Sequence, residues 1–91
     1  QEINIGRYYQ KRNRHLAAIE RFKVIVDKYN TTAQTPEALY RLTQSYLSLG
    51  ITEEAKKSTA VLAYNYKKSN WYKLSYDLLK KYGHEINDKK G

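Results

Sequence analysis

Few side chains in this 91-residue sequence have the chemistry and the spacing that catalysis requires. A nucleophile needs a base within hydrogen-bond reach and a third group that orients the base. The two histidines, His15 and His84, lie far apart, and neither has such neighbours. Glu53 and Glu54 are adjacent, so a helix would direct their carboxylates to different sides and they could not act as an acid–base pair. The sequence therefore predicts a protein that is not an enzyme.

The sequence also lacks the patterns that hold metals, cofactors or phosphates. It contains no cysteine, and neither histidine belongs to a cluster with the spacing of metal ligands. The four glycines are scattered, so none of them forms a glycine-rich loop that could cradle a phosphate. We therefore expect no catalytic residue, no metal site and no cofactor.

Regularly spaced cations could support a different chemistry, ionic binding of a partner. Arg14, Arg21 and Lys28 recur at seven-residue steps, so on one helix they would form a basic stripe. We expect this stripe to lie opposite an apolar side that includes Phe22 and Ile25. Two interpretations stay open: the stripe is a solvated helix face, or it docks against an acidic partner.

The whole chain is basic. Seventeen Lys and Arg against nine Asp and Glu give a net charge of +8, which favours nucleic acid, anionic lipid or an acidic protein as the partner. Lysine outnumbers arginine twelve to five, and asparagine and tyrosine are plentiful. An AT-rich coding sequence produces the same bias, so the charge is explained equally well by function or by composition.

The sequence contains no candidate for a membrane span or a signal peptide. No apolar run approaches the roughly 18–20 residues of a membrane span, and the first residues lack a basic segment followed by an apolar one. The chain begins with Gln1 instead of methionine. We interpret it as a fragment or a processed product and expect any targeting segment to lie upstream.

The elements that must position these side chains are all expected to be helices. Apolar residues recur at spacings of three and four, and no stretch alternates convincingly with a period of two. We predict five helices, which begin near Ile3, Asn13, Thr35, Thr52 and Asn70. The last four of these residues are predicted N-caps, and Gly50 and Gly83 are predicted to end the helices before them.

The spacing also predicts which side of each helix is buried. We expect Leu16 to join the buried side of the second helix, and Ile5 to share one side of the first helix with Tyr9. In the last helix we expect one buried side formed by Trp71, Leu74, Leu78 and Tyr82.

An internal repeat relates the first two helices to the next two. A shift of 37 residues places Tyr9 on Tyr46, and it places Ala18 on Ala55. The same shift places Ile25 on Leu62, Gly6 on Thr43 and Phe22 on Thr59. Small residues at such positions let the two helices of a hairpin approach closely, and hairpins that cannot bury their faces alone stack on one another.

The spacing of Gly6, Tyr9, Ala18 and Phe22 resembles the tetratricopeptide motif. We therefore predict an all-α fold of tetratricopeptide-like antiparallel helical hairpins, with two repeats and a C-terminal capping helix; an unrelated helical bundle is the alternative. The predicted boundaries, within one domain spanning residues 1–91, are 3–30 for the first repeat, 36–67 for the second, 70–82 for the capping helix and 83–91 for a flexible tail. The predicted repeat core consists of Tyr9, Ala18, Phe22, Ile25, Leu42, Tyr46, Ala55 and Leu62.

Longer strings resemble one family, the outer-membrane assembly lipoproteins called BamD, in their alphaproteobacterial form. The resemblance covers roughly residues 3–82. The strings that carry it are RYYQKR (7–12), AAIERFKVIVDKY (17–29), TPEALYRLTQSYLSLG (35–50), EEA (53–55), AVLAYNY (60–66) and SNWYKLSYDLL (69–79). Asn30, Lys67 and Lys68 depart from the family, which often has proline there. These departures loosen the turns and leave the helices untouched.

The resemblance implies a function that the residues alone do not show. Members of the family are periplasmic, are anchored to the outer membrane by a lipidated cysteine, and bind the periplasmic POTRA region of the barrel protein BamA together with smaller accessory lipoproteins. This chain would correspond to the C-terminal repeats, with the anchor upstream. Arg21 matches an arginine that the family has just before an apolar core position. It is therefore the best candidate in the basic stripe.

Two other functions stay open. The chain could be another tetratricopeptide adaptor of the cell envelope or the cytosol. A nucleic-acid-binding module is less favoured, because most aromatic residues fall at predicted core positions and few remain to stack on bases. We expect protein partners, no nucleic acid, a location at the periplasmic face of the outer membrane, and membrane attachment only through the upstream anchor. An exposed apolar end could also let the fragment self-associate.

Overall fold

The computed structural model describes residues 2–28 and 32–83, which form five α-helices. The helices are α1 (Glu2–Lys11), α2 (His15–Lys28), α3 (Thr35–Ser48), α4 (Thr52–Asn65) and α5 (Asn70–Lys81). The all-α, tetratricopeptide-like fold expected from the sequence is confirmed. The described part of the chain has no strand, and none of its helices is long and apolar enough to cross a membrane. The predicted flexible tail falls, from residue 84 onward, outside the described residues.

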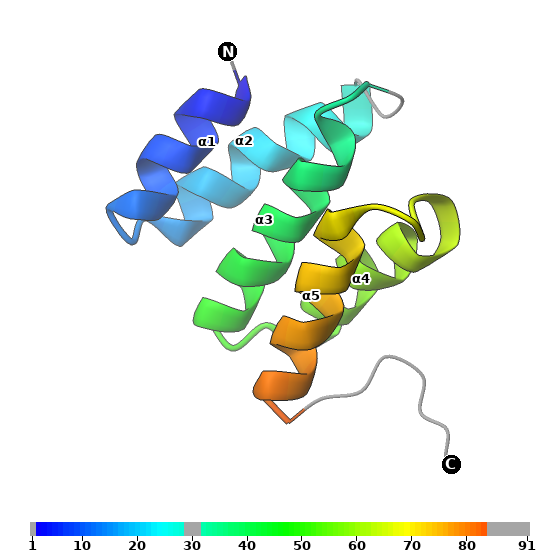
Figure 1. The fold of residues 1–91 in the computed structure, drawn as a ribbon. Helices are drawn as coiled ribbons and strands as arrows, with labels where there is room; N and C mark the ends of the chain where they lie inside the picture. The colour runs from blue at the N-terminus through cyan, green and yellow to red at the C-terminus, as the bar shows by residue number, and fades with distance from the viewer. Residues whose placement is uncertain (1, 29–31, 84–91) are drawn as a thin grey trace.

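The helices form two antiparallel hairpins and one added helix (Figure 1). In the first hairpin α1 packs against α2, and in the second α3 packs against α4. α2 also packs against α3, which joins the hairpins, and α5 packs against both α3 and α4. The C-terminal ends of α1, α3 and α5 therefore lie along one edge of the molecule (Figure 1).

The turn within each hairpin is closed by the same backbone hydrogen bonds. After α1, the amide of Asn13 donates to the carbonyl of Gln10 at 3.0 Å, and the amide of Arg14 donates to the carbonyl of Tyr9 at 2.9 Å. Asn13 has φ = 60°, a left-handed conformation that asparagine tolerates better than most residues. The prediction that Asn13 caps α2 is therefore wrong, because this residue ends α1.

Gly50 ends α3 in the same way. Its φ is 75°, its amide donates to the carbonyl of Leu47 at 3.0 Å, and the amide of Ile51 donates to the carbonyl of Tyr46 at 2.8 Å. A shift of 37 residues places Asn13 on Gly50. The two hairpins therefore use one turn geometry with two different residues at its left-handed position.

The three other predicted N-caps are wrong by one residue. The observed caps are Gln34, Ile51 and Ser69, where Thr35, Thr52 and Asn70 were expected. Ser69 acts as a true side-chain cap, since its Oγ accepts a hydrogen bond from the amide of Trp71 at 3.1 Å. Gln34 and Ile51 cap only through their carbonyls, which accept from the amides of Ala38 and Ala55, so no side-chain preference marks them in the sequence.

A single apolar cluster runs through all five helices. Among the predicted repeat-core residues, the buried ones are Ala18, Phe22, Ile25, Leu42, Tyr46, Ala55 and Leu62. Tyr9 is partly buried and packs against the cluster. Leu79 of α5, which is fully buried, connects the last helix to the same cluster.

Some residues that were predicted to be buried are exposed. Leu16 is 69% exposed and Ile5 is 37% exposed. α5 buries Ser75 and Leu79. Of the four residues predicted to be buried, Trp71 and Leu78 are partly buried against the core, and Leu74 and Tyr82 are exposed. The reason is that α5 rests in the angle between α3 and α4, with Trp71 against Tyr40 at 5.4 Å between ring centroids, and this position rotates the helix away from its most apolar row.

The two hairpins have different side chains at the equivalent contact between their paired helices. In the first, a Cβ added to Gly6 would overlap the ring of Phe22, so only glycine fits there. In the second, Thr43 replaces the glycine, and its Oγ1 lies 2.7 Å from Ser58 Oγ and 3.1 Å from Thr59 Oγ1. Where the first hairpin has the ring of Phe22 against Gly6, the second has Thr59 and Thr43 in a cluster of buried hydroxyls. Both positions of the contact differ together.

A buried carboxylate ties α1 to α3. Arg7 donates to both carboxylate oxygens of Glu37, at 2.9 and 2.7 Å, and Arg41 donates to the same group at 3.1 Å. Burial alone would raise the pKa of Glu37, but the hydrogen bonds and charges of Arg7 and Arg41 hold that pKa below its usual value. Gln10 extends the network by donating to the carbonyl of Arg41 at 3.0 Å and to Ser45 Oγ at 2.9 Å.

Candidate partner-binding groove

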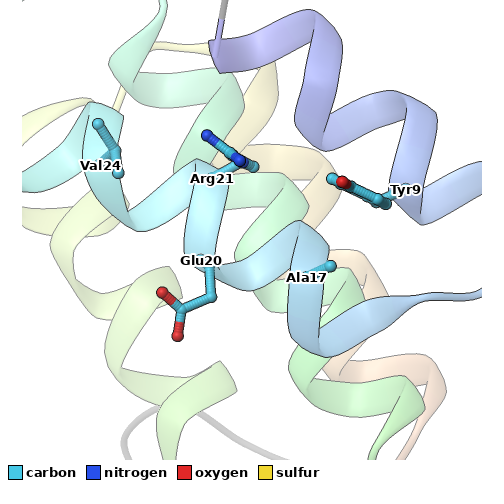
Figure 2. A pocket seen from close by; sticks show the side chains of 5 residues that line it. All are labelled: Tyr9, Ala17, Glu20, Arg21 and Val24. Atoms are coloured by element: carbon cyan, nitrogen blue, oxygen red, sulfur yellow. The ribbon is translucent and has the colours of Figure 1, made fainter.

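A groove lies between α1 and α2 on the side away from α3, with a volume of about 410 Å³ (Figure 2). Tyr9 of α1 lines it, together with Ala17, Glu20, Arg21 and Val24 of α2. The four α2 residues are spaced by three, one and three positions, which places them in one row on the helix surface. In Figure 2, Arg21 is directed toward the α1 side, where Tyr9 lies, and Glu20 is directed away from it.

Arg21 faces the neighbouring helix and does not lie opposite the core. Its Nη1 is 3.4 Å from Glu2 Oε1, and the two side chains are 43% and 33% exposed. The predicted position of the stripe is therefore wrong: Arg21 is three residues after Ala18 and four before Ile25, so all three lie on adjoining parts of the helix surface. The pair with Glu2 is a surface ion pair, worth at most about 1 kcal/mol.

The other two residues of the basic stripe have different surroundings. Arg14 precedes α2, and its carbonyl accepts the first helical hydrogen bond, from the amide of Ala18 at 3.0 Å. The side chains of Arg14 and Lys28 are exposed, and neither makes an ion pair with another described residue. The structure therefore brings only Arg21 into the groove.

A second groove has a lining equivalent to that of the first. It lies over α3 between α2 and α4, and every residue that lines the first groove has a counterpart there after a shift of 37 residues. These counterparts are Tyr46, Glu54, Lys57, Ser58 and Val61. The opposite wall of the second groove is a helix, α2, which contributes Lys23, Val26 and Asp27. Beside the first groove, no helix of residues 2–28 or 32–83 takes that place.

The two grooves differ in charge. Glu54 and Lys57 of the second groove pair with each other at 3.4 Å, whereas their counterparts in the first groove are Ala17 and Glu20. Burial raises the pKa of the Tyr46 hydroxyl, and the carboxylates of Glu54, Asp27 and Glu20 add to the rise. The first groove therefore combines apolar side chains with one anion, Glu20, and one cation, Arg21, which is held only by a weak intramolecular pair.

The described residues contain no candidate metal centre. No group of three or more His, Cys, Asp or Glu residues lies close enough to hold a metal ion in the part of the chain that the structure describes. His15 Nδ1 is 2.9 Å from Ser45 Oγ, so this imidazole links α2 to α3. His84 lies outside the described residues.

The residues whose ion pairs tie α1 to α3 were not predicted from the sequence. No such role was predicted for Glu37, Arg7 or Arg41. Arg7 and Glu37 are 30 positions apart in the sequence, and no local spacing reveals such a pair. The 37-residue repeat was the one signal that could have located the groove, because it relates the lining residues of both grooves.

Comparison with known proteins places the chain in one family. The family of outer membrane lipoproteins named YfiO matches residues 1–62. The chain is 52% identical over 81 residues to an outer membrane protein assembly factor BamD from Rickettsia prowazekii, and 50% identical over 78 residues to one from Caulobacter vibrioides. A BamD from Neisseria meningitidis is 35% identical over 68 residues. No solved structure shows a significant match.

These alignments cover most of this chain and a small part of each relative. They include 89% and 86% of this chain, but only 32% of the Rickettsia protein and 26% of the Caulobacter protein. The chain thus spans about a third or less of the length of the relatives it matches.

Proposed function

The chain belongs to the YfiO family of outer membrane lipoproteins, which includes the BamD assembly factors, and from this membership we propose that it is a non-catalytic scaffold that binds protein partners during outer-membrane protein assembly. Its place of action would be the periplasmic face of the outer membrane, and its partners would be the POTRA region of BamA and accessory lipoproteins. The Rickettsia and Caulobacter relatives carry the assembly role in their names.

The observation that carries this proposal is the groove between α1 and α2. Its counterpart at a 37-residue shift is walled by α2, a helix of the same chain, so the groove has a shape that suits a helix. Arg21 adds a cation at its margin that is already partly desolvated and is held by one weak pair with Glu2. A carboxylate of the partner could replace Glu2 and form a shorter, charge-assisted hydrogen bond.

A titration of the chain with the soluble POTRA region of BamA tests the proposal. We expect Arg21→Glu to weaken binding by about 1.5–3 kcal/mol, because it removes a charged hydrogen bond and introduces repulsion. Helicity, measured by circular dichroism, should stay unchanged. Lys28→Glu is the matched control: it makes the same change of charge on the same helix, outside the groove, and should have a much smaller effect.

An equal loss in the two variants would show that only net charge matters, and unchanged affinity of Arg21→Glu would remove the groove from the interface. Nucleic-acid binding, which the charge of +8 would permit, predicts a steep dependence of nucleic-acid affinity on salt. Several aromatic side chains needed for stacking on bases pack against the core instead: Tyr9, Tyr40, Tyr66, Trp71 and Tyr72.

A further inference from the structure

Two large apolar side chains are exposed at the edge where the hairpin turns meet. Leu16, just after the α1–α2 turn, is 69% exposed, and Leu49, at the α3–α4 turn, is 41% exposed. Together with Arg14 they line a shallow hollow of about 370 Å³, so the two turns are neighbours. Neither leucine contributes to the core, and their exposure has no explanation in the packing of the hairpins.

Three cations lie at or next to the α1–α2 turn that precedes Leu16. Lys11, Arg12 and Arg14 are exposed, and none of them forms an ion pair with another residue that the structure describes. Arg12 lies over the ring of Tyr8, 4.5 Å from its centroid, which leaves its charge available to solvent. We call Lys11, Arg12, Arg14, Leu16 and Leu49 the cationic edge.

The same edge continues to the end of α5. The C-terminal ends of α1, α3 and α5 point to it (Figure 1), and α5 carries Lys80 and Lys81 in its last turn, followed by Tyr82, which is 51% exposed. Three acidic residues lie near this part of the molecule. Glu53 and Glu54, at the start of α4, are paired with Lys56 at 3.8 Å and Lys57 at 3.4 Å, whereas Glu20 lies one helical turn after Leu16 and forms no ion pair with another described residue. Cations favour the negative ends of helices, which accounts for some of the charge but not for the exposed leucines.

We propose that the cationic edge rests on an anionic lipid surface, with Leu16 and Leu49 entering the interface and the cations above the phosphate groups. Exposed leucines next to clustered cations are the pairing that membrane-surface segments use, in which apolar burial and electrostatic attraction act together. Leu16 lies in the first turn of α2 and Leu49 is the C-cap of α3, so both are exposed at helix ends, where a fluid interface can accept them without a preformed pocket. The inference rests on the proposed function in one respect only: the protein must work beside a membrane.

Flotation of the 91-residue chain with vesicles tests this inference. We expect binding to vesicles of phosphatidylethanolamine and phosphatidylglycerol, and little binding when phosphatidylcholine replaces the anionic lipid. Arg14→Gln should weaken binding about fivefold, as the loss of one cation near such a surface implies. Leu16→Ser should weaken it by a similar factor or more, because the leucine no longer enters the interface.

Two matched controls separate an oriented contact from attraction by net charge. Lys67→Gln removes one exposed cation at the opposite, α4–α5 end, and Leu74→Ser removes an exposed leucine of α5. Both should bind vesicles nearly as well as the unchanged chain. Losses equal to those of Arg14→Gln and Leu16→Ser would overturn the proposal, as would the absence of binding to anionic vesicles.

The same variants distinguish this inference from the proposed function. Leu16→Ser should keep its affinity for the POTRA region and lose affinity only for vesicles. If instead it loses POTRA affinity and the chain does not bind anionic vesicles, the edge is a protein interface and the lipid proposal is wrong. Failure of POTRA binding in the unchanged chain would leave the vesicle result standing.

Discussion

Glu37 accepts hydrogen bonds from two arginines while its own side chain is only 11% exposed. Its carboxylate is charged in the folded protein at lower pH than in the unfolded chain, because Arg7 and Arg41 hold its pKa below the usual value. The unfolded chain therefore binds a proton first as the pH falls. The stability that Glu37 contributes is present above its unfolded pKa and is lost as the pH falls through the folded pKa.

We predict that Glu37→Gln lowers the free energy of unfolding at neutral pH by about 1–3 kcal/mol, because it keeps the shape and loses the charge that both arginines bind. Urea unfolding over a range of pH measures this effect. The difference between the variant and the unchanged chain should shrink as the pH falls below the usual pKa of glutamate. Asp77→Asn is the control, since its pair with Lys73 is exposed and should be worth no more than about 0.5 kcal/mol. A pH-independent difference would contradict this account.

The turns between paired helices depend on one residue each with positive φ. Asn13 takes the left-handed position after α1, and Gly50 takes the same position after α3. Residues other than glycine pay a steric cost there, which asparagine partly avoids and alanine does not. The left-handed backbone conformation is therefore less favourable at Asn13 in the first hairpin than at Gly50 in the second.

Substitutions at residue 13 should follow this order. We predict that Asn13→Ala lowers the free energy of unfolding by about 1 kcal/mol, and that Asn13→Gly leaves it equal or raises it by a few tenths. Thermal and urea unfolding of the three proteins provide the comparison. Gly50→Ala should lose at least as much as Asn13→Ala, because open space around Gly50 means that the backbone alone sets the cost. An alanine variant as stable as the asparagine form would rule out the left-handed turn.

At this scale the sequence predicted the helices well and their ends less well. Spacing of apolar residues and the glycines at positions 50 and 83 were enough to place five helices, because both signals are local. The caps at Gln34 and Ile51 use carbonyls alone, and such caps leave no mark on residue type. The buried side of α5 depends on the angle between α3 and α4, which no pattern within α5 records.

In the whole molecule, α5 makes the fewest contacts with other helices, since it packs only on α3 and α4. Trp71 is the single tryptophan and lies against Tyr40 of α3, so its fluorescence reports whether α5 is docked. Stacked helical hairpins unfold in part from their ends when the interface between neighbours is weakened. α5 is the element for which such partial unfolding is expected.

We predict that Leu79→Ala, which removes a fully buried side chain, lowers stability by about 2–4 kcal/mol. In urea, the midpoint followed by Trp71 fluorescence should fall below the midpoint followed by circular dichroism, because α5 detaches before the hairpins unfold. In the unchanged chain the two midpoints should lie closer together. Coincident midpoints in the variant would mean that α5 and the hairpins unfold as one unit.

The groove could be only partly predicted from the sequence. Arg21 was identified as the best candidate of its stripe, but its pair with Glu2 brings together residues 19 positions apart on different helices. The predicted stripe assumed one isolated helix, whereas the surface around Arg21 is set by how α1 lies on α2. Long-range packing of this kind follows from the fold and cannot be found from spacing along one helix.

The exchange of Phe22 over Gly6 for Thr59 beside Thr43 has a consequence for folding fidelity. Chains built from similar units risk pairing a helix with the wrong neighbour while they fold. If α4 took the place of α2 against α1, Thr59 would leave the space of a phenyl ring empty beside Gly6. If α2 took the place of α4 against α3, Phe22 would collide with Thr43. The side chains at this contact therefore favour the native helix pairing in each hairpin over pairing with a helix of the other hairpin, although the two hairpins have the same backbone arrangement.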